Sequence, residues 1–99
     1  MSAGFRPAIP PHVAEVVRSL PPELKRSIKH ALRAISVDPA CGEPLRRELA
    51  GLWKFRVRRF RIVYRGDRAR RVVQVMAIAP RRTIYEDLAD RIRRETREP

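Results

Sequence analysis

Basic side chains are concentrated in one central segment of this 99-residue chain. Residues 46–82 hold thirteen arginine or lysine residues and only two acidic ones, Glu48 and Asp67, for a net charge of +11. The flanking segments contribute +2 (residues 1–45) and −1 (residues 83–99) to the total of +12. Every basic residue in the segment except Lys54 is arginine, whose guanidinium suits bidentate phosphate contacts and stacking on bases. The charge therefore predicts a polyanion or an acidic protein as the partner of this segment.

Alternation of apolar and basic residues from Trp53 onward predicts two adjacent strands that sort these charges onto one face. The apolar face, which helices are expected to bury, holds Trp53, Phe55, Val57, Phe60, Ile62 and Tyr64. The opposite face is expected to present Lys54, Arg56, Arg58, Arg59, Arg61 and Arg65. Like charges on neighbouring strands destabilise a sheet, so we expect a polyanion to fill this face. The alternative is a polar sheet face that is merely basic.

The elements around these strands follow from the spacing of apolar residues and prolines. Two helical stripes separated by Pro21–Pro22 predict an antiparallel αα-hairpin: Val13, Val16, Val17 and Leu20, then Leu24, Ile28, Ala31, Leu32 and Ile35. Residues 5–9 form either a short edge strand or coil, because Pro7 cannot donate a ladder hydrogen bond. Gly66–Asp67 predicts a turn, and the apolar run at residues 72–79 predicts a buried central strand that ends at Pro80. A last helix is predicted by the apolar stripe of Tyr85, Leu88, Ala89 and Ile92. The predicted order is (β)ααβββα, an α+β fold whose antiparallel twisted sheet carries its helices against one face.

Length and composition limit the classes of protein that fit. A hydrophobic fraction of 43% supports one domain over residues 1–99, with residues 1–10 a loosely ordered N-terminus and residues 95–99 a polar tail. No apolar run approaches the roughly 20 residues that span a bilayer, and no secretory signal begins the chain. A single cysteine, Cys41, forms neither an internal disulfide nor a cysteine-rich metal site, and His12 and His30 lack metal-ligand spacing. We expect a cytoplasmic protein with no metal, no cofactor and no membrane partner.

Residues 49–64 (Leu-Ala-Gly-Leu-Trp-Lys-Phe-Arg-Val-Arg-Arg-Phe-Arg-Ile-Val-Tyr) resemble the central signature of the RelE/ParE superfamily of bacterial toxins. Residues 78–85 (Ile-Ala-Pro-Arg-Arg-Thr-Ile-Tyr) are similar to that family's strand end, basic pair and tyrosine. With the helix-proline-helix segment and the loop at residues 38–45, the resemblance spans roughly residues 12–92. One departure is Arg58–Arg59, which stands between the two strands where the family often has Gly-Asp, so this turn lacks the permissive glycine and gains charge.

The resemblance implies one of two activities of a type II toxin. RelE-like members cut mRNA in the ribosomal A site without metal, whereas ParE-like members poison DNA gyrase and lack the basic catalytic set. The catalytic positions that the resemblance implies are Lys54, Arg56, Arg61, Arg82 and Tyr85. The remaining arginines near them are expected to contact RNA phosphates: Arg58, Arg59, Arg65 and Arg81. Because all five catalytic positions carry suitable residue types, the RNase branch is favoured.

Cleavage by 2′-hydroxyl attack requires a base, cations for the charge of the phosphorane, and an acid for the 5′-oxygen. Lys54 is the candidate base and Arg61 and Arg82 the candidate phosphate clamps, while Tyr85 either stacks on a base, transfers a proton or is a core aromatic. The implied partners are the ribosome, mRNA and a cognate antitoxin. The antitoxin would lay an acidic or amphipathic segment over the basic face or displace the helix at residues 83–94. The alternatives are a ParE-like gyrase inhibitor and a non-catalytic basic nucleic-acid-binding module.

Overall fold

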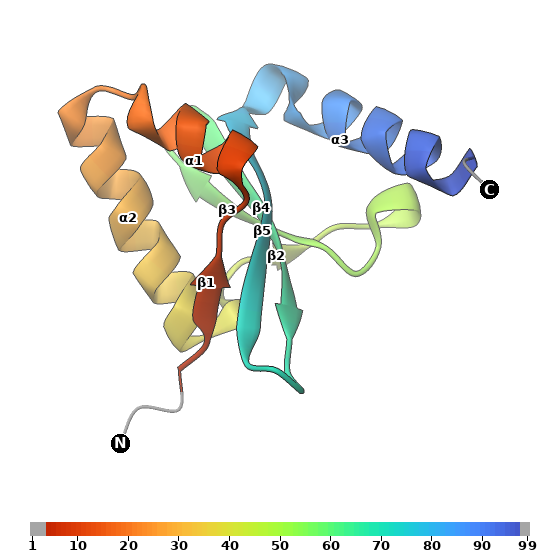
Figure 1. Cartoon of the computed structure of the whole chain (residues 1–99), viewed down its shortest axis with the longest axis horizontal. Helices are drawn as coiled ribbons and strands as arrows, with labels where there is room; N and C mark the ends of the chain where they lie inside the picture. The colour runs from red at the N-terminus through yellow and green to blue at the C-terminus, as the bar shows by residue number, and fades with distance from the viewer. Residues whose placement is uncertain (1–3, 98–99) are drawn as a thin grey trace.

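A five-stranded sheet lies at the centre of the computed structural model, which describes residues 4–97. The first three residues of the expected N-terminal segment (1–3) and the last two of the expected polar tail (98–99) lie outside the described residues. The strand order is β1-β5-β4-β3-β2. The elements in chain order are β1 (Arg6–Ala8), α1 (Pro11–Arg18), α2 (Pro22–Val37), the 3₁₀ turn η1 (Pro39–Cys41), β2 (Glu43–Pro44), the 3₁₀ turn η2 (Arg47–Leu49), β3 (Trp53–Val57), β4 (Phe60–Asp67), β5 (Val72–Pro80) and α3 (Arg81–Arg97). This order confirms the predicted α+β class, and Figure 1 shows the arrangement.

The strands pair as an antiparallel set with one parallel addition. β2, β3, β4 and β5 are antiparallel neighbours, whereas β1 joins β5 in parallel, so the sheet is mixed. Of the two alternatives for residues 5–9, edge strand or coil, the structure shows the edge strand, over residues 6–8. Pro7 lies in this edge strand, where a proline is tolerated. β4 continues through Gly66 and Asp67, and the turn itself occupies residues 68–71.

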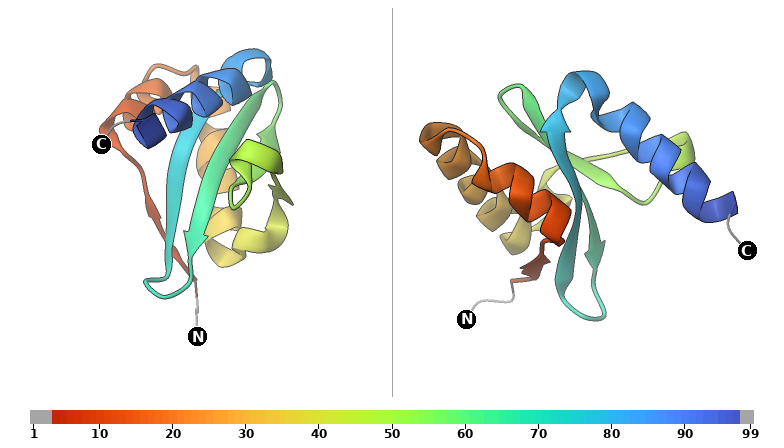
Figure 2. Two further views of the ribbon diagram at one scale, coloured as in Figure 1. Left: turned by 90° about the vertical axis from the view of Figure 1, so that its right-hand side faces the viewer. Right: turned by 45° about the horizontal axis from the view of Figure 1, so that its top comes forward.

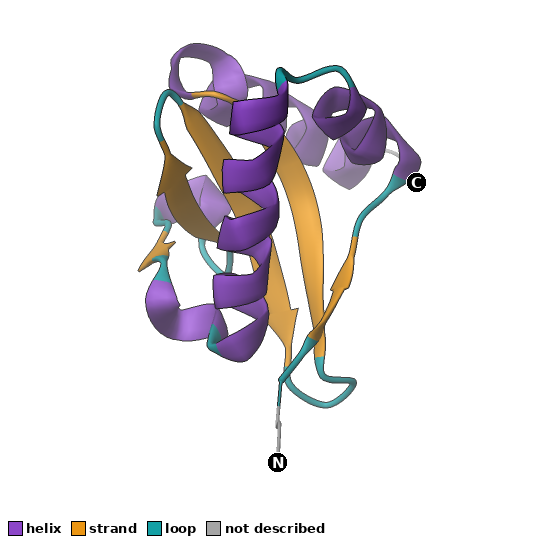
Figure 3. Ribbon diagram, turned by 90° about the vertical axis from the view of Figure 1, so that its left-hand side faces the viewer, coloured by secondary structure: helices purple, strands orange, loops and turns teal. Residues whose placement is uncertain are grey.

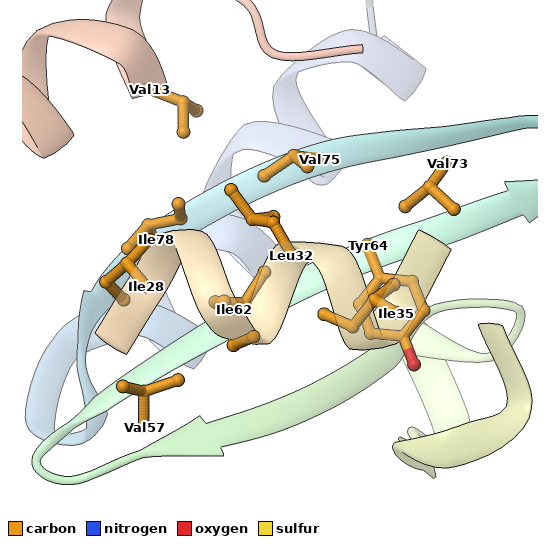
Figure 4. Close-up of a cluster of buried hydrophobic side chains, with 11 residues drawn as sticks. Val13, Ile28, Leu32, Ile35, Val57, Ile62, Tyr64, Val73, Val75 and Ile78 are labelled. Atoms are coloured by element: carbon orange, nitrogen blue, oxygen red, sulfur yellow. The ribbon is translucent and has the colours of Figure 1, made fainter. Parts of the chain in front are cut away.

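The αα-hairpin covers one face of the sheet, as its apolar stripes predict. α2 lies across β3, β4 and β5 (Figure 3), and the buried residues of its stripe are Ile28, Ala31, Leu32 and Ile35. They meet the inward residues of the strands in one core cluster, drawn in Figure 4, which includes Val13, Val57, Ile62, Tyr64, Val73, Val75 and Ile78. Burial of these side chains is the main source of the fold's stability, at roughly 1.5–3 kcal/mol each.

The last helix packs against the opposite face of the sheet, which corrects the expectation that all helices share one face. Ile84 and Leu88 of α3 are buried against Val63, Ala77 and Leu52 in a second cluster. Val63 points away from its neighbours Ile62 and Tyr64, because successive side chains of a strand alternate. Figures 1 and 2 show the sheet between the αα-hairpin on one side and α3 on the other. The face that was expected to be basic is therefore apolar around Val63 and Ala77, with Lys54 beside Val63 and the arginines toward the two ends of the strands.

Tyr64 lies at the base of the first cluster with no exposed surface, and its hydroxyl donates a hydrogen bond to the carbonyl oxygen of Pro39 at 2.6 Å. Burial, with a smaller contribution from the neighbouring Cys41 thiolate, raises the pKa of Tyr64 to about 12 from its ordinary value near 10. The hydrogen bond connects β4 to η1, the turn that follows α2. Tyr64 therefore holds the connection between the αα-hairpin and β2.

We expect the free energy of unfolding to fall as the pH rises from about 10 to about 12. In this window the unfolded tyrosine loses its proton while the buried one keeps it, so rising pH favours unfolding. The raised pKa of Tyr64 makes this loss about 2.5 kcal/mol at most. Denaturant titrations across this window should show a smaller loss for Tyr64→Phe, which at neutral pH is less stable by about 1 kcal/mol for lack of the hydrogen bond. Equal pH slopes for the two proteins would contradict the assignment.

Candidate functional site

Four cationic side chains from three elements meet around one small cavity at the end of the sheet where α3 begins. Lys54 and Arg56 come from β3, Arg61 from β4 and Arg81 from the first residue of α3. The cavity has a volume of ≈ 40 Å³, and its lining includes one carboxylate, Glu43 of β2. The register explains the convergence, since Arg56 pairs directly with Arg61 and Glu43 with Lys54. Three residues that the sequence predicts as catalytic thus lie together.

Arg61 is 7% exposed, and its guanidinium is held against the backbone of its own hairpin. Its Nη1 donates hydrogen bonds to the carbonyl oxygens of Arg58 at 3.0 Å and Phe60 at 2.9 Å. A buried guanidinium that is hydrogen-bonded in this way is fixed in position before any ligand arrives. Arg61 therefore contributes a fixed positive charge to the cavity and also stabilises the β3–β4 turn.

Arg58 and Arg59 form the β3–β4 turn itself, which corrects their expected place on the sheet face. The alternation is interrupted at these two residues, because Val57 and Phe60 are both apolar and pair with each other, and the two-residue hairpin reverses the chain between them. Arg58 adopts a φ of 55°, in the left-handed region that glycine adopts most easily. The carbonyl oxygen of Arg59 accepts a hydrogen bond from the backbone N–H of Arg81 at 2.9 Å. The turn thereby fixes the start of α3 beside the cavity.

Arg58→Gly is expected to raise the free energy of unfolding by up to about 1 kcal/mol. A non-glycine residue in the left-handed region costs roughly 1–2 kcal/mol, and the larger entropy of glycine in the unfolded chain offsets part of the relief. Thermal or denaturant unfolding measures the change. Arg58→Val, which is β-branched and unsuited to a positive φ, should be destabilising and serves as the opposite control. The expectation fails if glycine is the less stable of the two.

Tyr85 lies under Lys54 on the first turns of α3. The Lys54 Nζ is 5.9 Å from the centre of the Tyr85 ring, at the limit of a cation–π contact. Tyr85 is half-buried and packs against the second core cluster, and its hydroxyl is buried with no hydrogen-bond partner among the described residues. Of the roles left open for Tyr85, this packing favours a core aromatic, and the same ring lies beside the Lys54 ammonium.

Besides Arg58, Arg59 and Tyr85, two further sequence-predicted residues do not line the cavity. Arg82 is exposed on the first turn of α3 and is not among the lining residues, so its catalytic role stays a prediction. Arg65 lies near the other end of β4, beyond the buried Val63, and its Nη2 contacts the Gln74 side-chain oxygen at 3.4 Å. The arginines are therefore divided between the two ends of the strands.

Two lining residues were not among the predicted catalytic positions. Arg81 was expected to contact phosphates only, and Glu43 was not singled out at all. β2 is only two residues long and includes Pro44, so no periodic pattern marks it as a strand. The charge of Glu43 among positive neighbours was visible in the sequence, but its place opposite Lys54 depends on the pairing of β2 with β3.

The described part of the chain was also compared with the requirements of metal sites and membrane spans. No group of three or more His, Cys, Asp or Glu residues there is arranged to hold a metal ion. No described helix is both long and apolar enough to cross a bilayer. Cys41 is a free, exposed thiol, and His12 and His30 are exposed on α1 and α2.

Comparison with known proteins gives a family and a set of similar folds. The family model that matches residues 12–85 describes the ParE toxin of the type II toxin–antitoxin system parDE. The crystal structure of the toxin–antitoxin complex RelBE2 from Mycobacterium tuberculosis contains a chain with a TM-score of 0.71 and 26% identity, over 82% of this chain and 95% of that one. No curated protein sequence matches the chain.

Two further solved structures show the same fold at lower identity. A mutant of the E. coli toxin RelE in the free state has a TM-score of 0.74 and 19% identity, covering 90% of this chain and 98% of that chain. The YoeB/ParE toxin from Agrobacterium tumefaciens has a TM-score of 0.67 and 20% identity, over 77% and 98% of the two chains. At these identities the likeness concerns the fold alone.

Proposed function

The chain belongs to the RelE/ParE superfamily of type II toxin–antitoxin toxins, and within it we propose that this protein is an mRNA endoribonuclease that inhibits translation. The observation that carries the proposal is the cavity lined by Lys54, Arg56, Arg61 and Arg81. Four cations around one small space, one of them fixed by hydrogen bonds, are suited to a dianionic phosphorane. The positive end of the α3 dipole, at Arg81, adds to the same field.

The proposed reaction is attack of a ribose 2′-hydroxyl on the adjacent phosphorus, with the 5′-oxygen as leaving group. Lys54 takes the hydroxyl proton, and the three arginines stabilise the charge that develops on the phosphate oxygens. The bond from phosphorus to the 5′-oxygen breaks, which leaves a 2′,3′-cyclic phosphate, and the released 5′-oxygen takes a proton from solvent water to become a hydroxyl. The ring of Tyr85 positions the lysine. Glu43 offsets part of the positive charge while the cavity is empty of substrate. No metal takes part in this scheme.

The proposed setting is the ribosomal A site in the cytoplasm, where mRNA is presented as a single strand. A partner that presents the strand suits this site, because the small cavity is lined mainly by cations, which bind phosphate without reading sequence. A cognate antitoxin is the second partner, as in the RelBE complexes of other organisms. We propose that its acidic or amphipathic segment covers the basic cavity or displaces α3, which is fastened to η2 by the Arg93–Glu48 ion pair at 3.0 Å.

The proposal is tested by brief induction of the protein in cells, followed by mapping of mRNA 5′ ends. New ends inside translated codons, absent from untranslated regions and from cells that express Arg81→Ala, are the expected result. Intact messages in growth-arrested cells would overturn the ribonuclease assignment. Intact messages in cells that continue to grow would show that the protein has no toxic activity under these conditions.

The second candidate function is inhibition of DNA gyrase, and the observation in its favour is the family model, which describes a ParE toxin. A gyrase poison would induce DNA-damage signalling and leave mRNA intact, so the same induced cells discriminate between the two. The cationic cavity supports the ribonuclease, because members of the ParE-like branch lack the basic catalytic set that the resemblance assigns to Lys54, Arg56 and Arg61.

A further inference from the structure

A second basic surface adjoins the cavity on the other side of β3. It is a groove of ≈ 680 Å³ between α2 and β3, lined on one wall by Arg26, Lys29, His30 and Arg33. These four residues are spaced i, i+3, i+4 and i+7, so they share one exposed face of α2. The face extends about 10.5 Å along the helix from the first to the last of them.

The other wall of the groove is the outer edge of β3. Phe55, Arg56 and Val57 line it, and Phe55 is half-buried, which leaves part of its ring at the surface. β2 pairs only with Trp53 and Lys54, so in the described residues no strand pairs with the rest of this edge. No carboxylate is among the residues that line the groove.

Arg56 lines both the groove and the cavity, so the two spaces meet at one side chain. We propose that the groove between α2 and β3 binds the single-stranded RNA that flanks the scissile phosphate. In this arrangement Arg56 contacts the strand where it leaves the cavity, the cations of α2 follow its phosphates, and the Phe55 ring offers a surface on which a base stacks. The inference rests on the proposed function, which it extends from one phosphate to the adjoining nucleotides.

An acidic segment of an antitoxin is the other occupant with suitable charge. The observations favour RNA because a strand with its phosphate in the cavity must continue over an adjoining surface, and the groove is such a surface. Repeated cations along a helix with an aromatic ring opposite are also the pattern of sequence-tolerant single-strand binding.

The test compares two double variants that remove the same charge from different places. Arg26→Gln/Arg33→Gln removes two arginines from the groove, and Arg68→Gln/Arg70→Gln removes two from the turn between β4 and β5. All four residues are exposed, and that turn lies at the opposite end of β5 from the start of α3 (Figure 1). The probe is a 2′-O-methyl RNA of about ten nucleotides, a length within the usual single-strand site sizes. It lacks the attacking hydroxyl, so fluorescence anisotropy measures binding without cleavage.

The groove variant is expected to bind the probe about tenfold more weakly than the wild type, with a salt slope smaller by about 1.4, while the turn variant changes much less. Equal weakening in both variants would show a general effect of charge and overturn the groove. Unchanged RNA binding together with lost binding of an acidic antitoxin peptide would assign the surface to the antitoxin instead. If the wild type binds the probe but cuts no mRNA, the ribonuclease proposal fails while the groove remains supported. If the wild type does not bind the probe at all, the groove proposal fails, while the mapping of mRNA 5′ ends separately decides the ribonuclease proposal.

Discussion

Arg81→Ala is expected to lower the rate of mRNA cleavage by about 10²–10³-fold, which is the usual cost of removing one preorganised group that stabilises transition-state charge. Arg81 is the suitable residue for this test because its side chain lines the cavity while its structural contact, the hydrogen bond to Arg59, is made by the backbone N–H. Truncation to alanine keeps that contact and favours the helix. Arg61 is less suitable, since its side chain also holds the β3–β4 turn. Cleavage of a defined message on purified ribosomes measures the effect, and thermal unfolding verifies the fold.

Arg82→Ala is the matched control, because it removes the same charge from the next residue of the same helix. Arg82 is exposed and outside the cavity lining, so its loss is expected to reduce cleavage by less than about tenfold, as for a general phosphate contact. A larger effect at Arg82 than at Arg81 would move the anion site to the position that the family resemblance indicates. Equal and small effects at both would remove the start of α3 from the site.

The fold was largely predictable because most of its elements are amphipathic with one clear period. The stripe from Leu24 to Ile35 and the alternation from Trp53 to Val57 each match an observed element, α2 and β3. Each pattern records which side chains are buried. The family resemblance was confirmed by the family model, which matches residues 12–85.

The side of the sheet that α3 covers was not predictable from those patterns alone. The apolar stripe of α3 shows that one face of the helix is buried, but it does not show which face of the sheet that stripe packs against. Val63 was the available signal, because it is apolar at a position where alternation expects a polar residue, and it lies in the cluster that α3 covers. The expected basic face wrongly included Arg58 and Arg59, although the family resemblance implied a turn at these two residues and two consecutive polar residues interrupt the alternation there.

For the site, the sequence indicates residue types, and the pairing register decides which of them meet. Lys54, Arg56 and Arg61 converge because β3 and β4 are direct neighbours, as the two strands of a two-residue hairpin are. The choice between Arg81 and Arg82 depends on the helical phase at the first residue of α3. Neighbouring residues of a helix point about 100° apart, so a shift of one residue changes which arginine faces the cavity.

Gly42→Ala is expected to destabilise the protein by about 2–4 kcal/mol, a large share of the stability of a domain of this size. The φ of Gly42 is −87°, which any residue adopts, so the cost arises from space and not from backbone conformation. An added Cβ would collide with the carbonyl oxygen of Lys54 and would lie 2.5 Å from the Tyr64 hydroxyl. The first of these is backbone, so β2 and β3 would have to separate, and the Tyr64–Pro39 hydrogen bond would be disturbed. A fall in Tm of about 10 °C or more is the corresponding observation.

Gly66→Ala is the control for this substitution, because the same methyl group at Gly66 meets the Pro39 side chain at 3.4 Å, close to an ordinary contact. Its effect is expected to stay below about 1 kcal/mol. The same two variants also separate packing from catalysis. Gly42 directly precedes Glu43, which lines the cavity and pairs with Lys54, so Gly42→Ala should lower cleavage even at temperatures where the protein remains folded. A Gly42→Ala protein with wild-type stability would show that β2 is not held against β3 in solution, and the position of Glu43 in the cavity would then have to be abandoned.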